Sequence, residues 1–335
     1  MEERRRARRL GLTLLLALAV AVPAAGRALA VDALVPMGRA VGIELEAGGV
    51  MVAGLSEVET DDGVRAPAAE AGLQPGDVIT AVGQRETRSA AELLSALSAL
   101  DGGAVDLTLR RGTETLTLIV TPVMGREGRW QLGLWLRDGV SGIGTVTYYD
   151  PASGAFGALG HGINDMESGK LLPFEGGTLT GARVVDVVKG APGAPGELCG
   201  KPDPEQVLGE LGKNTGCGVF GTAEFADAGE AVPIASEDEV RLGPATILAT
   251  VDGETVGEYA VEISRIYRQP EDHRFLMLTV TDPQLLGLTG GIVQGMSGSP
   301  ILQNGKLVGA VTHVLLSDAT RGYGISIREM LDAAA

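Results

Sequence analysis

The chain has 335 residues, with 43 acidic and 27 basic side chains and a formal net charge of −16. This excess of negative charge excludes nucleic-acid binding as the main function, because a polyanion repels a phosphate backbone. The length fits two domains. The 50 glycines and the aromatic content of only 4% favour β-rich domains with many tight turns over helical bundles.

The N-terminus predicts export. Five arginines between residues 4 and 9 precede an apolar run from Leu10 to Val22, and Ala28-Leu29-Ala30 places small residues at the spacing of a cleavage site. Residues 1–30 are therefore expected to be a secretory signal peptide, or alternatively an uncleaved membrane anchor. In both cases the rest of the chain is expected to be extracytoplasmic.

Residues 31–122 are expected to form a first domain with mixed elements. Ser89, followed by Glu92 three residues later, is a capping box that begins a helix. In chain order the predicted elements are a strand at 41–55, a Pro-Gly turn at 74–77, a strand at 78–82, a helix at 87–100 and a hairpin at 105–120 that turns at Arg111-Gly112.

This order, with the segment AGLQPGDVI at residues 71–79, resembles a PDZ domain. The resemblance implies peptide capture by β-augmentation, in which a ligand strand is added beside a strand edge. The matching carboxylate-binding loop is Gly42-Ile43-Glu44-Leu45, although the acidic side chain of Glu44 would repel a free carboxylate. The alternative is a PDZ-like fold that serves only for packing or regulation.

Residues 123–335 are expected to form a second domain. It begins with a short polar linker at 124–130, is rich in glycine and strand-like segments, and has one predicted helix at its C-terminal tail. Its most informative segment is GMSGSP at residues 295–300, where glycines flank Ser297 and Pro300 fixes the exit. Asn304-Gly305 then predicts a hairpin, so the serine lies on a loop before strands. This argues against the strand–turn–helix nucleophile elbow.

The segment resembles the GxSGxP signature of chymotrypsin-like serine proteases. The resemblance implies that Ser297 is the nucleophile, that the N–H groups of Gly295 and Ser297 form the oxyanion hole, and that residues 309–314 pair with a substrate backbone. Ser299 is the less favoured alternative nucleophile. A glycine-serine turn without chemistry is the other interpretation.

A general base must come from three histidines. His161 lies in the glycine-bracketed loop FGALGHGIND and is the preferred base, with His313 as the alternative. His273 lies in the charged segment RQPEDHRF, which is expected to be solvated.

The orienting acid is chosen among three aspartates. Asp282 follows an alternating strand, lies 15 residues before Ser297 and is preferred over Asp165 and Asp186. Surface capping or turn formation is the alternative explanation for each of these aspartates.

No cofactor is expected, and no run of His, Cys and carboxylate residues has the spacing of a metal site. Cys199 and Cys217 could form a disulfide in an exported protein or remain two reduced thiols.

Taken together, the segments GHGIND, TDPQLLGLTGGIVQGMSGSPILQNGKLVGAVTHVLLSD and GYGISI resemble the SpoIVB peptidase family. The resemblance implies a mainly β fold, a PDZ domain followed by a chymotrypsin-like double β-barrel serine peptidase domain. It also implies Ser297, His161 and Asp282 as the catalytic residues. HtrA proteases combine the same modules, but place the protease domain first.

The family resemblance further implies a serine endopeptidase of sporulation signalling. It would cleave itself and be released between forespore and mother cell, where it would cut a membrane-bound regulator of an intramembrane protease and so activate a late sigma factor. The PDZ domain would hold the protein's own terminal segment, through self-association, or its target. The alternative function is a non-catalytic, exported PDZ scaffold on a degenerate protease fold.

Overall fold

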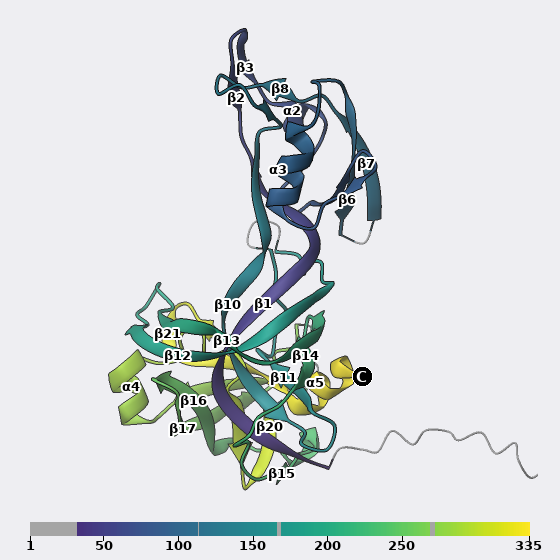
Figure 1. Ribbon diagram of the computed structural model, residues 1–335. Coiled ribbons are helices and arrows are strands. Elements are labelled where there is room, and N and C mark those ends of the chain that lie inside the picture. Colours follow the sequence, from purple (N-terminus) through teal and green to yellow (C-terminus); the bar gives the residue numbers. More distant parts are fainter. Residues whose placement is uncertain (1–31, 113, 166–168, 269–271) are drawn as a thin grey trace, which may run out of the picture. The chain divides into compact units, whose positions relative to one another are not determined.

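The computed structural model describes residues 32–335 except 113, 166–168 and 269–271 (Figure 1). The predicted signal segment, residues 1–30, lies outside the described residues. Within the described part, none of the helices has both the length and the apolar character needed to cross a bilayer.

Six antiparallel strands form a first barrel. Each strand pairs with two others in a closed ring that runs β1–β10–β11–β14–β13–β12 and returns to β1. The strands are β1 (Ala33–Leu55), β10 (Leu134–Tyr149), β11 (Ala155–Ala158), β12 (Gly176–Val188), β13 (Glu197–Thr215) and β14 (Gly218–Ala223). Ile43, Val146, Phe156 and Leu179 are buried together in its core.

A second closed barrel follows in the chain, with the ring order β16–β17–β18–β21–β20–β19. Its strands are β16 (Gly243–Asp252), β17 (Thr255–Ile266), β18 (Leu276–Val280), β19 (Pro300–Gln303), β20 (Lys306–Leu315) and β21 (Asp318–Ser326). In β17 the buried Tyr259, Val261 and Ile263 alternate with exposed residues, as expected for a strand with one face towards the core. Numbered within each barrel, both rings have the order 1-2-3-6-5-4, so the fold is the predicted chymotrypsin-like double barrel.

The PDZ region lies between β1 and β10 in the chain, and its predicted elements are confirmed. Ser89 accepts the backbone N–H of Glu92 and caps α3, whose Leu93 and Leu97 are buried. The elements are β2 (Val58–Thr60), β3 (Gly63–Arg65), α2 (Pro67–Glu70), β4 (Val78–Val82), β5 (Arg85–Glu86), α3 (Ala90–Ser98), β6 (Val105–Arg111) and β7 (Glu114–Val120).

Strand β1 is shared between the first barrel and the PDZ sheet. Residues 41–46 pair with both β12 and β10, whereas Val50 and Met51 pair with β4 of the PDZ sheet. In Figure 1, β1 and β10 lie side by side along both regions. The PDZ elements are thus inserted between the first two strands of a barrel.

This arrangement corrects the predicted carboxylate-binding loop. Gly42, Ile43, Glu44 and Leu45 are not in a loop but in the barrel part of β1, where Ile43 pairs with Leu179 on one side and Gly142 on the other. Because neighbouring strands occupy both hydrogen-bonding edges, these residues cannot receive a peptide terminus. The sequence of residues 41–55 is glycine-rich and alternating throughout. It therefore does not distinguish the half of β1 that lies in the barrel from the half that lies in the PDZ sheet.

Two further segments differ from the prediction. The predicted linker 124–130 is bracketed by a short hairpin of β8 (Val123–Met124) and β9 (Trp130–Gln131), and α4 (Pro283–Thr289) follows β18. The predicted C-terminal helix is α5 (Ile327–Ala334). The smaller elements β15 (Val232–Pro233) and the 3₁₀ helix η1 (Glu237–Glu239) lie between the barrels in the chain.

Candidate active site

The loop GMSGSP connects α4 to β19 and is held by both barrels. Thr145 of β10 donates its N–H to the carbonyl of Ser297 at 3.2 Å and its hydroxyl to the carbonyl of Gly295 at 2.8 Å. From the other side, the N–H of Gly298 donates to Val311 of β20 at 2.8 Å. The serine is therefore fixed at the junction of the two barrels.

The glycine at position 298 is required by this close approach. Its φ is +97°, and a Cβ there would lie 2.0 Å from the carbonyl oxygen of Thr145. Only glycine adopts this backbone conformation without strain and leaves room for the neighbouring strand.

Two backbone N–H groups of the loop are available as donors. Among the described residues, neither the N–H of Gly295 nor that of Ser297 has a hydrogen-bond acceptor. Unpaired amides beside a hydroxyl match the requirement for stabilising an oxyanion, and they are the two predicted from the sequence.

The two serines of the loop have different environments. Ser297 is half-buried and lines a pocket of about 930 Å³. Ser299 is fully buried, and its hydroxyl has no hydrogen-bond partner in the described part of the chain. Only Ser297 is accessible to a substrate.

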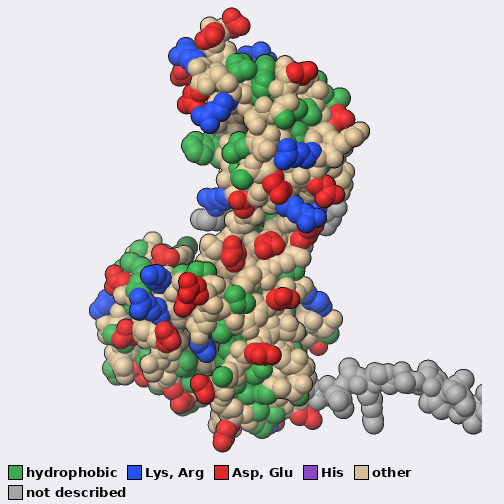
Figure 2. All heavy atoms as spheres, in the orientation of Figure 1, with side chains coloured by type: hydrophobic (Ala, Val, Ile, Leu, Met, Phe, Trp, Pro, Cys, Tyr) green, Lys and Arg blue, Asp and Glu red, His purple; other side chains and the backbone are tan. Residues whose placement is uncertain are grey.

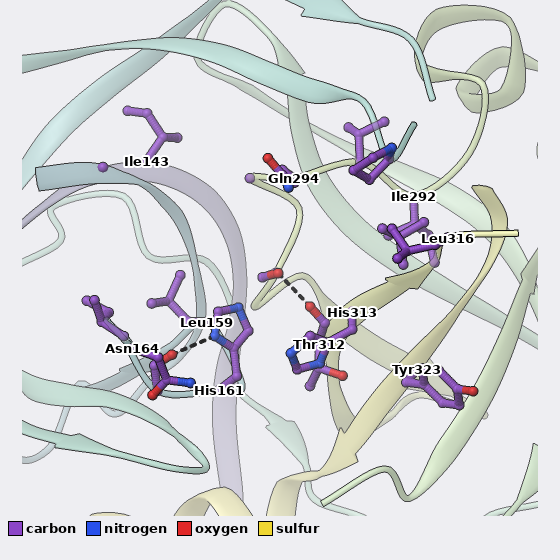
Figure 3. Close-up of a pocket in the computed structure, with 18 of the residues that line it drawn as sticks. Ile143, Leu159, His161, Asn164, Ile292, Gln294, Thr312, His313, Leu316 and Tyr323 are labelled. Atoms are coloured by element: carbon purple, nitrogen blue, oxygen red, sulfur yellow. Dashed lines mark hydrogen bonds between the residues drawn. The ribbon is translucent and has the colours of Figure 1, made fainter. Parts of the chain in front are cut away.

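His161 lines the same pocket, 136 positions before Ser297 in the chain. Figure 3 shows the imidazoles of His161 and His313 next to each other, with Ile143 and Leu159 on one side and Ile292 and Tyr323 on the other. His161 was the base preferred from the sequence and His313 was the alternative, and both line the pocket.

The ring of His161 has a defined tautomer. Its Nδ1 lies 2.9 Å from the carbonyl oxygen of Gly162 (Figure 3), which can only accept, so Nδ1 carries the proton and Nε2 is left with the lone pair. Burial lowers the pKa of His161 below its usual value of 6.5, so the ring is neutral at pH 7. A neutral imidazole with a free Nε2 can act as a general base.

His313 lies on β20 with its ring centroid 5.0 Å from that of His161. Burial lowers the pKa of His313 to about 4, and repulsion by His161 and by Arg274 contributes in the same direction. His313 is therefore uncharged at neutral pH and presents a neutral imidazole to the pocket.

Ser297 is not hydrogen-bonded to His161 in this structure. Its Oγ donates instead to the carbonyl oxygen of Thr312, at 2.6 Å. The hydroxyl proton therefore faces β20, and transfer of this proton to His161 requires a rotation of the serine side chain.

Asp282 occupies a different environment from the one expected for an orienting acid. Its Oδ1 accepts the N–H groups of Gln284 and Leu285, at 2.9 and 3.0 Å, so it is the N-cap of α4. Hydrogen bonds from these amides and from Ala260 lower the pKa of the carboxyl. Asp282 does not line the pocket, and its catalytic role stays a prediction.

The alternative acids are not brought to the pocket either. Asp186 lies exposed on β12, where its carboxylate accepts the N–H of Val187. The N–H of Asp165 donates to Lys170, and neither aspartate lines the pocket. His273, expected to be solvated, contacts Cys217 and Glu329. Cys199 and Cys217 are free thiols.

Two residues of the site were not singled out in the sequence. Thr145 supports the serine loop, and Thr312 accepts the hydrogen bond of Ser297. A strand pattern cannot identify such contacts, because it does not show which residues of other segments a threonine meets in the folded protein.

The PDZ sheet has an open edge beside helix α3. Residues 134–137 of β10 pair with β1 on one edge, and no described strand pairs with the other. Helix α3 lies beside this edge, since the N–H of Ala90 donates to Asp138. Leu94 of α3 is 57% exposed and Trp135 of β10 is 66% exposed. An open strand edge next to a helix with exposed apolar side chains suits β-augmentation.

Charged side chains of both signs are interspersed on the surface. On the face shown in Figure 2, acidic side chains lie among the Lys and Arg side chains, and no continuous basic stripe is visible.

Comparisons with known proteins agree with this geometry. The SpoIVB peptidase S55 family matches residues 128–331, and the PDZ domain family matches residues 63–111. Bovine mitochondrial serine protease HTRA2 is 48% identical over 56 residues, which cover 17% of this chain and 12% of that protein. The chain thus matches only about an eighth of the length of this curated relative.

Solved structures with similarity include a PDZ domain and a protease. The PDZ domain of the SdrC-like protein Lmo2051 from Listeria monocytogenes is 24% identical, with 27% of this chain and 90% of that chain covered and a TM-score of 0.23. The active form of the Rv3671c protease from M. tuberculosis is 14% identical, with 58% and 72% covered and a TM-score of 0.31.

The family match spans more than half of the chain and includes His161 and Ser297, which line the same pocket. The chain therefore belongs to the SpoIVB peptidase S55 family and carries a PDZ domain.

Proposed function

We propose that this protein is an endopeptidase in which Ser297 is the nucleophile and His161 is the general base. One observation carries the proposal: the two side chains come from different barrels and line one pocket, next to the unpaired N–H groups of Gly295 and Ser297. Nucleophile, base and oxyanion donors are the minimum set for acyl transfer at a peptide bond.

The reaction follows from this arrangement. Nε2 of His161 takes the hydroxyl proton of Ser297, and Oγ attacks the substrate carbonyl carbon. The N–H groups of Gly295 and Ser297 stabilise the oxyanion that forms. His161 then gives the proton to the leaving amine, and water, activated by the same imidazole, hydrolyses the acyl-enzyme.

The hydrogen bond from Ser297 to the carbonyl of Thr312 belongs to the resting state, before substrate binds. Attack requires the hydroxyl to leave this carbonyl and turn to His161. A substrate strand laid along residues 312–314 of β20 would displace the serine from that position, which links substrate binding to assembly of the nucleophile. Asp282 is retained as the predicted orienting acid, with the test given below.

The PDZ region is proposed to bind a peptide segment at the open edge of β10 beside α3. The bound segment is the protein's own terminal region or part of its target. Membership of the PDZ family supports peptide binding, and Leu94 and Trp135 are the exposed apolar contacts at this edge.

The physiological role that we propose is sporulation signalling. The protein is exported, acts at the forespore membrane or in the space between forespore and mother cell, cleaves itself, and cuts a membrane-bound regulator of an intramembrane protease. Membership of the SpoIVB family and the basic and apolar N-terminal segment support this role.

Incubation of the purified protein alone tests the activity. Gel analysis and intact-mass measurement should show new chain ends that accumulate with time in the wild type and in Ser299→Ala. Ser297→Ala should stay intact while its melting temperature matches that of the wild type. Cleavage by Ser297→Ala at the wild-type rate would assign the nucleophile elsewhere.

A further inference from the structure

A cluster of Cys217, His273 and Glu329 lies apart from the residues that line the catalytic pocket. Among the described residues it is the one group of three or more His, Cys, Asp and Glu side chains with ligand atoms close enough to hold one metal ion, all within 4.8 Å of one another. Its members come from the β13–β14 turn of the first barrel, the segment before β18 of the second barrel, and α5.

The thiol of Cys217 and the carboxylate of Glu329 both contact the imidazole of His273, and Sγ lies 4.0 Å from its Nε2. Sγ of Cys217 lies 3.6 Å from Nδ1 of His273, and a carboxylate oxygen of Glu329 is hydrogen-bonded to the same Nδ1. One ring N–H cannot point well at two acceptors. The ligand atoms of the three groups lie within 4.8 Å of one another, so side-chain rotations alone can bring them around one ion.

The backbone of His273 is in the left-handed conformation. Its φ of +61° is one of three positive values among the described residues that are not glycine. Such conformations are uncommon and are concentrated at functional sites. A second of the three, Leu159, lies two residues before the proposed base His161.

The chemistry of the set favours a borderline-soft cation. Thiolate, imidazole and carboxylate are zinc ligands, and a thiolate with a carboxylate would balance a divalent charge. The side chains of Glu329 and His273 are 29% and 47% exposed and that of Cys217 is buried, so the centre is reached from solvent on one side.

We propose that Cys217, His273 and Glu329 form a Zn²⁺ site that joins both barrels to the C-terminal helix, with a fourth position left to water. The thiol proton of Cys217 passes to solvent when the ion binds. The site has a link to the catalytic pocket, since Arg274, next to His273, lines that pocket and lies over the ring of Tyr323 at 4.7 Å.

The test uses the full chain, stripped with EDTA and kept reduced. The wild type should bind one Zn²⁺ per chain in competition with a chromophoric chelator. With Co²⁺ it should show a sulfur-to-cobalt charge-transfer band. Cys217→Ser should lose the band and weaken Zn²⁺ binding by more than about 100-fold, because removal of a ligand costs at least as much as removal of a supporting residue. Cys199→Ser is the matched control and should behave as the wild type.

Glu329→Gln keeps the shape of the site and tests the proposal even if Cys217→Ser does not fold. It should retain the charge-transfer band and bind Zn²⁺ at least about tenfold more weakly. Mg²⁺, which prefers oxygen ligands, should not compete. Failure of the wild type to bind Zn²⁺ at a 1:1 ratio, or equal binding by Cys217→Ser, would overturn the proposal. Because none of these readouts measures peptide cleavage, they stand independently of the proposed peptidase mechanism.

Discussion

Two buried threonines on β10 differ in whether they support the serine loop. Thr145 and Thr147 are both buried in the same strand. The hydroxyl of Thr145 donates to the carbonyl of Gly295, whereas the hydroxyl of Thr147 has no partner among the described residues. An unpaired buried hydroxyl contributes nothing to offset its desolvation.

Thr145→Val should therefore lower the free energy of unfolding by about 1–3 kcal/mol, because it leaves the Gly295 carbonyl without its partner. The peptidase kcat/KM should fall by more than about tenfold, since Gly295 supplies a proposed oxyanion donor. Thr147→Val, measured by the same denaturation and kinetic assays, should be neutral or stabilising. Equal effects of the two substitutions would contradict a supporting role for Thr145.

The protonation of His161 sets the expected pH profile. Burial lowers its folded-state pKa below 6.5, and the base is active only when it is neutral. The kcat/KM should therefore be constant through neutral pH and fall as the pH drops through a value below 6.5. The same shift means that any stability gained from the neutral ring is present above 6.5 and is lost on acidification.

His313→Asn provides the control for this profile. Since the pKa of His313 is about 4, its ring carries no charge over most of the acidic limb, and the limb should keep its position in the variant. A limb centred above 6.5 in the wild type would contradict the proposed environment of His161.

At the scale of the element, Asp282 has two possible roles: it is the N-cap of α4, and it is the predicted catalytic acid. Asp282 followed by Pro283 is a standard N-cap and first-turn pair, and the structure has both. Helix α4 was not predicted from the sequence, because its seven residues carry no clear apolar period.

Asp282→Ala should lower the free energy of unfolding by about 1 kcal/mol, whereas Asp282→Asn should leave it unchanged, because asparagine caps as well as aspartate. Denaturant titration measures both. The peptidase activity of Asp282→Asn then tests the predicted catalytic role. A drop of about 10⁴-fold at unchanged stability would assign it as the orienting acid, and wild-type activity would leave it as a cap.

Local signals were sufficient for many elements. Ser89, the Pro-Gly turn at 75–76 and Asn304-Gly305 marked α3, the start of β4 and the β19–β20 hairpin, because each fixes the backbone through its own chemistry. The glycines around Ser297 identified the serine loop for the same reason. The partners of that loop, Thr145 and Thr312, required knowledge of how the barrels meet.

At the scale of the whole molecule, the shared strand β1 determines how the two modules depend on each other. Residues 33–46 close the first barrel between β10 and β12, and the PDZ elements follow within the loop between the first two barrel strands. The sequence placed residues 31–122 in one domain because strand periodicity is local and does not identify the partner strand. For the same reason, the sequence did not predict that Cys217, His273 and Glu329 lie close together.

Excision of the PDZ region should leave the peptidase barrels folded. Glu46 pairs with Gly139, so a two-residue turn between them removes residues 47–138 and keeps the six-strand ring. The variant should unfold cooperatively at a somewhat lower temperature, since Leu45 and Leu172 lose neighbours from the PDZ side. Deletion of residues 33–46 should instead abolish folding, because it opens the ring. Near-native melting of that truncation would contradict the shared-strand topology.

The most direct test of the account is labelling by a fluorophosphonate, which reacts only with an activated serine. The wild type and Ser299→Ala should carry one label, mapped by mass spectrometry to Ser297, and the labelling rate should fall by orders of magnitude in His161→Gln. A label that persists in Ser297→Ala, or a rate that is unchanged by His161→Gln, would contradict the assignment of these two residues as nucleophile and base.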